Sequence, residues 1–582
     1  MDIVTSNLTR KVRPYVQTML IAGTLVLAVL MVLWSEKPPQ TKGENVSELY
    51  FSSERAMHHV IQMAQKPHPN GSLAIEEVRG YIMSEMEQMG LNPELQESKD
   101  HIKTDYFEGN VELTNILGVL KGSGSGKPLL LMSHYDSVSS GPGANDATVS
   151  VAALLETVRA LRAGPQLQND IWFLLTDGEE KGLLGAQAFF RDPIHRGAVG
   201  MVANFEARGS KGAYIMFQTS EGNGRLVKEF AKAVRNPVSN SLLADLYKKL
   251  PNDTDLTVAL AYGLPGLNFA YGDGWTAYHT PMDNVDNVSL NTMQHQGENA
   301  LSVAQHFGNM DLSNLESGDH VYFNLLGLFI QYPASWATVI SIIFAACLLA
   351  LIMILSRRSL IRWKGITLGI IMTITAMLLS CGISYGLWQL VNNGWAERMT
   401  MRSGATYDAM LYSICFLLLA LIVNVLIFKL VQKQVRVIEM MVSGMLLFLL
   451  LLILSTWMLP GASYLFAIPL FSHTIAIVCV VRSKDPSHTL HHPIVLLLTW
   501  VIPILIFTSF FYILFIMMPL SINLFSSMIA SLILSYAYPA LLVLIRSWRL
   551  VIPAVIVILI VLLGIGWIQA EPGPSRPVYT MR

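Results

Sequence analysis

Runs of apolar residues long enough to cross a lipid bilayer dominate the second half of this 582-residue chain. A helix needs about 20 mostly apolar residues to span the hydrocarbon core of a membrane. One such run comes before a mixed polar region that extends to about Asp319, and eight more follow it. The nine predicted spans are Tyr15–Trp34, Trp336–Leu355, Ile366–Leu390, Met410–Phe428, Ile438–Met458, Tyr464–Val481, Ile494–Phe515, Ile522–Ile545 and Val551–Ile568. Nine crossings would place the two ends of the chain on opposite sides of the bilayer.

Basic residues occur in every second connection between these spans, and cytoplasmic loops of membrane proteins collect Lys and Arg. The basic groups are Arg10, Lys11 and Arg13; Arg357, Arg358, Arg362 and Lys364; Lys429, Lys433 and Arg436; Arg482 and Lys484; and Arg546 and Arg549. The predicted organisation is a cytoplasmic N-terminus (1–14), a transmembrane anchor (15–34), an exterior domain (35–320), an eight-helix transmembrane domain (321–568) and an exterior C-terminal tail (569–582). The long apolar core of the first span, with no small-x-small cleavage site after it, favours an uncleaved anchor over a signal peptide.

The exterior region alternates strand-like apolar runs with helical segments, which predicts an α/β fold. The runs are "PLLLMSHYD", "ATVSVAALLETVRALRA", "DIWFLLTD", "GLLGAQAFFRD", "GMVANFEA", "AYIMFQTS" and "LPGLNFAYG". We expect a mixed, mostly parallel central sheet flanked by helices, joined to an all-α membrane domain. In such sheets, ligands bind beyond the carboxyl ends of the strands.

Acidic residues and histidines gather at those predicted strand ends. They are His134 and Asp136 after the first strand, Asp146 at the start of the next helix, Asp177, Glu179 and Glu180 in "TDGEEK", Glu206 in "NFEARG" and His279 in "YHTPMDN". A lone Asp before a helix is usually a cap, but so many anions on one edge of a sheet would repel each other without a cation between them. A mixture of His and carboxylate ligands suits zinc or another divalent transition metal.

The segments "HYDS", "GANDAT", "TDGEEKGLLGA", "NFEARG" and "YHTPMDN", in this order, resemble the co-catalytic dizinc aminopeptidase family of zinc-dependent exopeptidases. That family also contains glutamate carboxypeptidases and glutaminyl cyclases. The resemblance covers roughly residues 47–306. With its N-terminal anchor and multi-span C-terminal region, the chain is similar to the membrane-bound branch of endoplasmic reticulum metallopeptidases and vacuolar membrane proteases.

The resemblance implies two Zn²⁺ ions per chain and a role for each residue of the set. His134 and Glu206 would bind the first zinc, Glu180 and His279 the second, and Asp146 would bridge both. Asp136 would lie behind His134 and fix its tautomer. Glu179 would be the general base.

The predicted function is a membrane-anchored zinc exopeptidase, most simply an aminopeptidase. Carboxypeptidase or glutaminyl-cyclase activity on the same fold stays open, as does a transporter or sensor with an inactive peptidase-like domain. Expected partners are peptide substrates and the lipid bilayer, with no nucleic acid. The predicted location is a bacterial plasma membrane with a periplasmic domain, or an endoplasmic reticulum or vacuole membrane with a luminal one. His473 lies within a predicted span, and both a functional role and a role in packing stay open for it.

Overall fold

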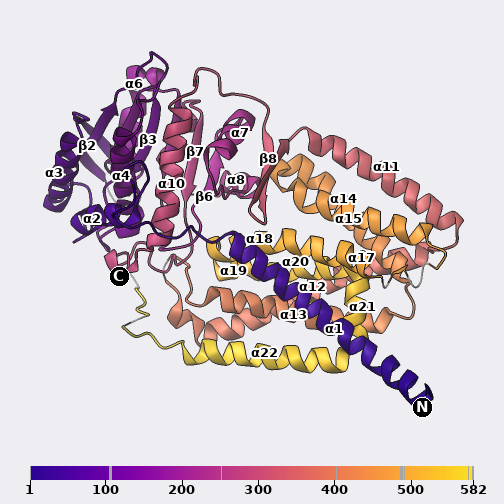
Figure 1. Ribbon diagram of the computed structural model, residues 1–582. Coiled ribbons are helices and arrows are strands. Elements are labelled where there is room, and N and C mark those ends of the chain that lie inside the picture. The colour runs from indigo at the N-terminus through magenta and orange to yellow at the C-terminus, as the bar shows by residue number, and fades with distance from the viewer. Residues whose placement is uncertain are drawn as a thin grey trace. The chain divides into compact units, whose positions relative to one another are not determined.

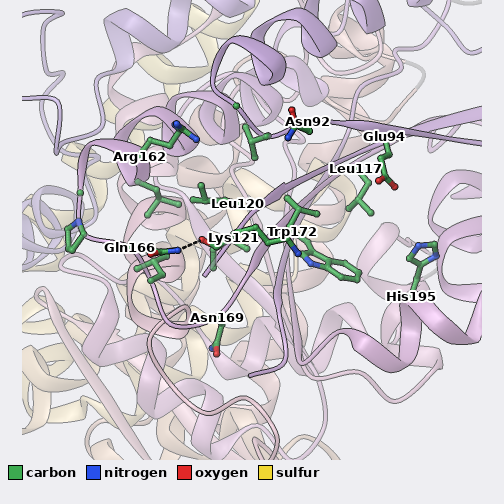
Figure 2. A pocket seen from close by; sticks show the side chains of 18 residues that line it. Asn92, Glu94, Leu117, Leu120, Lys121, Arg162, Gln166, Asn169, Trp172 and His195 are labelled. Atoms are coloured by element: carbon green, nitrogen blue, oxygen red, sulfur yellow. Dashed lines mark hydrogen bonds between the residues drawn. The ribbon is translucent and has the colours of Figure 1, made fainter. Parts of the chain in front are cut away.

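The computed structural model describes residues 2–103, 108–250, 252–401, 403–485, 489–490, 492–574 and 576–579 (Figure 1). The chain forms two compact units. One is Glu36–Ser335, and the other combines Met1–Ser35 with Trp336–Arg582. We call them the α/β unit and the membrane-side unit, and describe each by itself.

A seven-stranded mixed sheet forms the centre of the α/β unit, with strand order β1-β2-β4-β3-β5-β7-β6. Its strands are β1 (Glu94–Lys103), β2 (Glu108–Leu120), β3 (Leu129–His134), β4 (Ile171–Thr176), β5 (Met201–Phe205), β6 (Ile215–Thr219) and β7 (Gly266–Ala270). The central strands β4, β3, β5 and β7 run parallel to each other, while β1, β2 and β6 pair antiparallel at the two sides. The predicted fold class is therefore confirmed. Strands β1 and β2 are not among the strands that the sequence analysis predicted.

The central strands are almost completely buried because helices cover both faces of the sheet. Leu129 and Leu131 of β3 belong to the same buried cluster as residues of α4 (Val149–Ala163) and α10 (Leu290–Phe307). Their neighbours Leu130 and Met132 pack with α5 (Leu184–Arg191) and α9 (Asp255–Ala261). Successive side chains thus enter opposite layers, as the strand repeat requires. Figure 1 shows α4 and α10 in front of the sheet.

The remaining elements of this unit surround the sheet. They are α2 (Ser53–Met63), α3 (Leu73–Gln88), the π-turn η1 (Ala144–Thr148), α6 (Pro193–Ala198), α7 (Gly224–Ala233), α8 (Ser241–Tyr247), η2 (Val285–Asn287) and the hairpin β8 (His320–Leu325) and β9 (Leu328–Pro333). The unit extends to Ser335, past the boundary predicted at residue 320, because buried Tyr322 and Phe323 of β8 tie the hairpin to it.

In the described part of the membrane-side unit, every named element is a helix. Its elements are α1 (Asp2–Ser35), α11 (Trp336–Arg357), α12 (Trp363–Gly394), η3 (Ala396–Met399), α13 (Ala409–Val431), α14 (Val437–Met458), η4 (Pro460–Ala462), α15 (Ser463–Arg482), α17 (Pro493–Leu496), η5 (Leu497–Val501), α18 (Ile502–Met517), α19 (Leu520–Asn523), α20 (Ser526–Tyr536), α21 (Tyr538–Arg546) and α22 (Trp548–Ile568). Within the described residues, eight helices are long and apolar enough to cross a membrane, or nine if one bent pair counts as a span.

That bent pair corrects the predicted span Ile522–Ile545, which is not one straight helix. Leu520–Tyr536 and Tyr538–Arg546 meet at an angle of 92°. Pro539 is the second residue of α21, and it lacks the N–H that a continuous helix would donate to the carbonyl of Ser535. The break frees the carbonyl of Tyr536, which lies 2.9 Å from Nε2 of His473 and accepts its N–H. The fully buried His473 also packs on the Tyr536 ring at 3.7 Å, so its observed contacts are those of a residue that holds the break.

Neutral polar side chains join three helices in the interior of the membrane-side unit. Asn424 of α13 donates to Ser531 of α20 at 2.8 Å, and Ser531 donates to Ser380 of α12 at 2.7 Å. Lipid chains are as apolar as leucine, so hydrogen bonds of this kind contribute to helix association inside a bilayer. The seam therefore fixes α20 against its neighbours.

We expect the bent pair α20–α21 to complete a crossing, because Arg546 and Arg549 after it would then lie on the cytoplasmic side with the other basic connections. Tags placed before Met1 and after Arg582 should then be cleaved from opposite sides of sealed vesicles. Detergent-opened vesicles, in which both tags are cleaved, are the control. Cleavage of both tags from the same side of sealed vesicles would show that the pair re-enters the membrane without crossing it.

Candidate metal centre

The predicted ligands come together at the carboxyl ends of the parallel strands. His134 is the last residue of β3, Glu180 follows β4, Glu206 follows β5 directly, and His279 lies in the loop after β7. Asp146 lies in η1, which leads from β3 into α4. Parallel strands bring their carboxyl ends to one edge of the sheet, so residues far apart in sequence meet there.

The five side chains form two groups that share one carboxylate. Nε2 of His134 lies 3.2 Å from Oδ1 of Asp146 and 3.4 Å from Oε2 of Glu206. Nε2 of His279 lies 3.3 Å from Oδ2 of Asp146 and 3.1 Å from Oε2 of Glu180. Within each group, one ligand atom per residue lies within 4.8 Å of the others. The two oxygens of Asp146 therefore face two different sites.

The electrostatics of the cluster fit divalent metal ions. Burial alone would raise the pKa of Asp146, but the two imidazoles lower it to about 2. Burial would lower the pKa of His279, yet Asp146 and Glu180 raise it to about 10. Oε1 of Glu180 is buried with no hydrogen-bond partner among the described residues. The carboxylates of the cluster thus favour positive charge, and one carboxylate oxygen has no partner among the described residues. Both features fit bound cations, and the His and carboxylate donors suit zinc.

Asp136 links the two strand-end loops. Its carboxylate accepts the backbone N–H groups of Glu179 at 3.1 Å and Glu180 at 3.3 Å. Nδ1 of His134 lies 3.0 Å from the backbone oxygen of Asp136 and 3.5 Å from its Oδ1. The carbonyl is thus the nearer acceptor for the His134 N–H, and the carboxylate orients the two neighbouring glutamates.

The glutamate loop is also held from its other side by Asn70. Its side-chain N–H donates to Oδ1 of Asp177 at 2.9 Å, and its side-chain oxygen accepts Nζ of Lys181 at 2.9 Å. Asp177 and Lys181 flank the Glu179–Glu180 pair in the sequence. Asn70 therefore fixes both ends of the loop. The sequence gives no sign of this role, because Asn70-Gly71-Ser72 has the composition of an ordinary turn.

Asp283 positions the bridging residue. Its Oδ2 accepts the backbone N–H of Asp146 at 3.1 Å, and its Oδ1 accepts that of Asn145 at 2.7 Å. The Tyr271 hydroxyl donates to Asn145 at 2.9 Å. Burial and the negative charge of Asp146 raise the pKa of Asp283 to about 7. Asp283 belongs to the segment "YHTPMDN", which also contains His279, and this shared segment is the sequence signal that could have identified it.

Glu179 lies outside both ligand groups but within their field. Burial raises its pKa well above the usual value, and the charges of Glu206 and Glu180 add to this, against the opposing effect of His134. The same surroundings act on His134: burial lowers its pKa, but Glu206 and Glu179 outweigh that and raise it. Neighbouring glutamates thus differ in position, one inside a ligand group and one beside it.

Two further residues at the cluster have no assigned role in the sequence analysis. Asp255 is fully buried at the start of α9, accepts the Thr176 hydroxyl, and has its pKa raised to about 7 by burial and by Glu206. The Tyr278 ring stacks on His279 at 3.7 Å. In sequence Asp255 has the form of a helix cap. Tyr278 is marked only by preceding His279.

Residues 115–304 match the sequence model of Peptidase family M28. This part of the chain is a peptidase family M28 domain. It includes all five clustered residues as well as Asp136, Glu179 and Asp283.

The M28 domain also matches curated membrane proteins. Endoplasmic reticulum metallopeptidase 1 of Mus musculus is 30% identical over 248 residues, 41% of this chain and 27% of that protein. The vacuolar membrane protease of Candida albicans (strain WO-1) is 33% identical over 279 residues, 47% of this chain and 32% of that protein. The chain thus spans about a third of the length of these relatives. Among solved structures, an aminopeptidase from Aneurinibacillus sp. strain AM-1 aligns with 15% identity and a TM-score of 0.38, over 44% of this chain and 95% of that one.

The shared position of Asp146 generates a test. We expect purified Asp146→Ala to contain less zinc than Glu206→Ala, because loss of the shared carboxylate weakens both groups while loss of Glu206 weakens one. Metal analysis of the full-length protein in detergent measures this. Asp170→Ala, which removes a carboxylate paired with Lys121 on the surface, is the matched control and should keep the wild-type metal content. Equal zinc in the Asp146 and Glu206 variants would contradict a shared ligand.

Proposed function

We propose that this chain is a membrane-anchored zinc exopeptidase that holds two zinc ions, and that the water attacking the peptide bond loses its proton to Glu179. The observation that carries the proposal is the geometry of Asp146, whose two oxygens face His134 on one side and His279 on the other. A carboxylate in that position suits two metals better than one. The M28 domain and the names of the curated relatives support peptide hydrolysis.

In this proposal, His134, Asp146 and Glu206 hold one zinc, and Asp146, Glu180 and His279 hold the other. The chemistry that zinc supplies in such a site is Lewis acidity, which polarises a carbonyl group and makes water a better nucleophile. The chain's own contribution is to keep the ligands in place. Asp136 orients the glutamate loop and Asp283 orients the backbone of Asp146.

Glu179 is the proposed general base because it is a carboxylate beside the ligand groups rather than within them. A carboxylate oxygen of Glu179 would accept the proton of the attacking water and return it to the nitrogen of the leaving amine. Its raised pKa suits that exchange, since a base must also be able to hold the proton. Glu180 would bind the metal, so the two adjacent glutamates would have different roles.

An aminopeptidase is the simplest form of this activity, and short or unfolded peptides are the proposed substrates. The alternative of an inactive domain in a transporter or sensor is disfavoured by the complete set, because a domain without catalysis has no need of Glu179 beside intact ligands. The proposed location is a membrane, with the M28 domain on its exterior or luminal face. The relatives carry the names of the endoplasmic reticulum and the vacuolar membrane.

The division of labour between the two glutamates predicts different variants. Glu179→Gln should keep both metals and lower kcat by at least about two decades, because general-base catalysis contributes 10²- to 10⁴-fold. Glu180→Gln should lose metal together with activity. Zinc analysis and steady-state kinetics on a peptide library, with the purified full-length protein, measure both effects.

Two results of this experiment would contradict the proposal. A metal-replete Glu179→Gln with nearly full activity would show that the base is another group. Fully active wild type with one zinc per chain would point to a mononuclear centre instead.

A further inference from the structure

Arg208 lies on the same side of its chain segment as the metal ligand Glu206. The pairing of β5 with β7 continues past the end of the strands, where Glu206 N–H donates to Phe269 O at 2.9 Å and Arg208 N–H donates to Tyr271 O at 3.0 Å. In an extended segment, alternate residues face the same side. Phe205 and Ala207 are buried together in the apolar core, so Glu206 and Arg208 both face away from it.

The contact between Asn204 and Glu206 confirms this alternation. Nδ2 of Asn204 lies 3.1 Å from Oε1 of Glu206, so these two side chains share a side as well. Asn204 is buried, Glu206 enters the metal cluster, and Arg208 is partly exposed. Asn204, Glu206 and Arg208 therefore lie in order from the buried core, through the metal cluster, to its partly exposed edge.

Arg208 also lies near the second ligand group. Its guanidinium carbon is 4.9 Å from the centre of the Trp275 ring, in the loop that carries His279. Tyr278 stacks on His279. Burial and the charges of Asp146, Glu180 and Glu179 raise the pKa of Tyr278, and the positive charge of Arg208 opposes this rise. The side chain thus lies against the loop that carries His279, within electrostatic range of Tyr278.

The guanidinium of Arg208 has no ion pair and no side-chain hydrogen bond with any residue that the structure describes. The guanidinium lies over the Trp275 ring, and a cation–π contact of this kind uses none of its N–H groups to pair with an oxygen. Those N–H groups form a planar fork that matches a carboxylate. An arginine held by its face, with its donors unused beside a cluster of ligands, is suited to receive an anion that arrives with the substrate.

We propose that Arg208 binds a substrate carboxylate, which makes short peptides with a free C-terminus near the scissile bond, dipeptides above all, the preferred substrates. This inference rests on the proposed peptidase function and adds the substrate class to it. Arg208 is then a specificity-determining residue, separate from Glu179 and the ligands.

The test compares kcat/KM for Ala-Ala and for its C-terminal amide, with the purified full-length protein. In Arg208→Gln, kcat/KM for Ala-Ala should fall about ten- to a hundredfold, the range of charge-assisted hydrogen bonds, mainly through KM. The amide should be cleaved as by the wild type. Arg208→Lys should recover part of the loss. The matched control is Arg196→Gln, whose guanidinium lies 4.6 Å over the Tyr262 ring; it should change neither substrate.

A third substrate, the amide of Ala-Glu, separates the two sources of a carboxylate. If its cleavage also depends on Arg208, the residue recognises an acidic side chain rather than the C-terminus, and the dipeptide preference is wrong. An equal fall for Ala-Ala and its amide, or no fall for either, would overturn the proposal and leave the peptidase function standing.

Direct binding keeps the inference testable even if the wild type cleaves no peptide, the result that would defeat the proposed function itself. Calorimetric titration of Ala-Ala and its amide into zinc-loaded Glu179→Gln, with and without Arg208→Gln, measures recognition without turnover. Tighter binding of the free acid that disappears with Arg208→Gln supports the proposal. The same affinity for both ligands in the presence of Arg208 contradicts it.

Discussion

The repulsion among buried carboxylates is the constraint on which the M28 domain depends. Asp136, Asp146, Glu180, Glu206 and Asp255 are buried or nearly so at one edge of the sheet, where charges are costly unless they are paired. In the two ligand groups, the imidazoles of His134 and His279 compensate part of this charge. Bound metal would complete the charge balance, and the surrounding residues hold the ligands in place for it. Asp283, Asn70 and the Asp136 carboxylate do this through backbone and side-chain hydrogen bonds.

In the membrane-side unit, neutral groups satisfy buried polar atoms at the helix break and along the seam between three helices. Inside a bilayer, every backbone polar group needs a partner from the protein, because lipid offers none. The break between α20 and α21 would leave the Tyr536 carbonyl unpaired, and His473 supplies its partner. The Ser380–Ser531–Asn424 seam provides hydrogen bonds between helices without placing a charge there. A broken helix is therefore compatible with the apolar surroundings of this unit.

Sequence patterns failed where an element is polar or where a residue has an ordinary alternative role. Strand β1, "ELQESKDHIK", lies at the edge of the sheet, and its polar composition hides it among loops. Asp255 has the form of a helix cap, and only folding shows that it faces Thr176 and the field of Glu206. The span 522–545 has the hydropathy of a straight helix, and Pro539 alone could not reveal a bend of 92°. Each of these depends on contacts between segments far apart in the chain.

The sequence by itself determined the division into an aqueous and a membranous part, the α/β class, and the residues that meet at the strand ends. The period and length of the hydrophobic runs predict the two parts and the α/β class. The carboxyl ends of parallel strands must share an edge of the sheet, and this predicts which residues meet there. Only the tertiary structure decided that the oxygens of Asp146 face two different groups, that Glu179 lies beside the ligands, and that the Arg208 side chain forms no ion pair with any residue that the structure describes. Those facts depend on side-chain direction and on distances of a few ångströms between separate loops, which no pattern along the chain records.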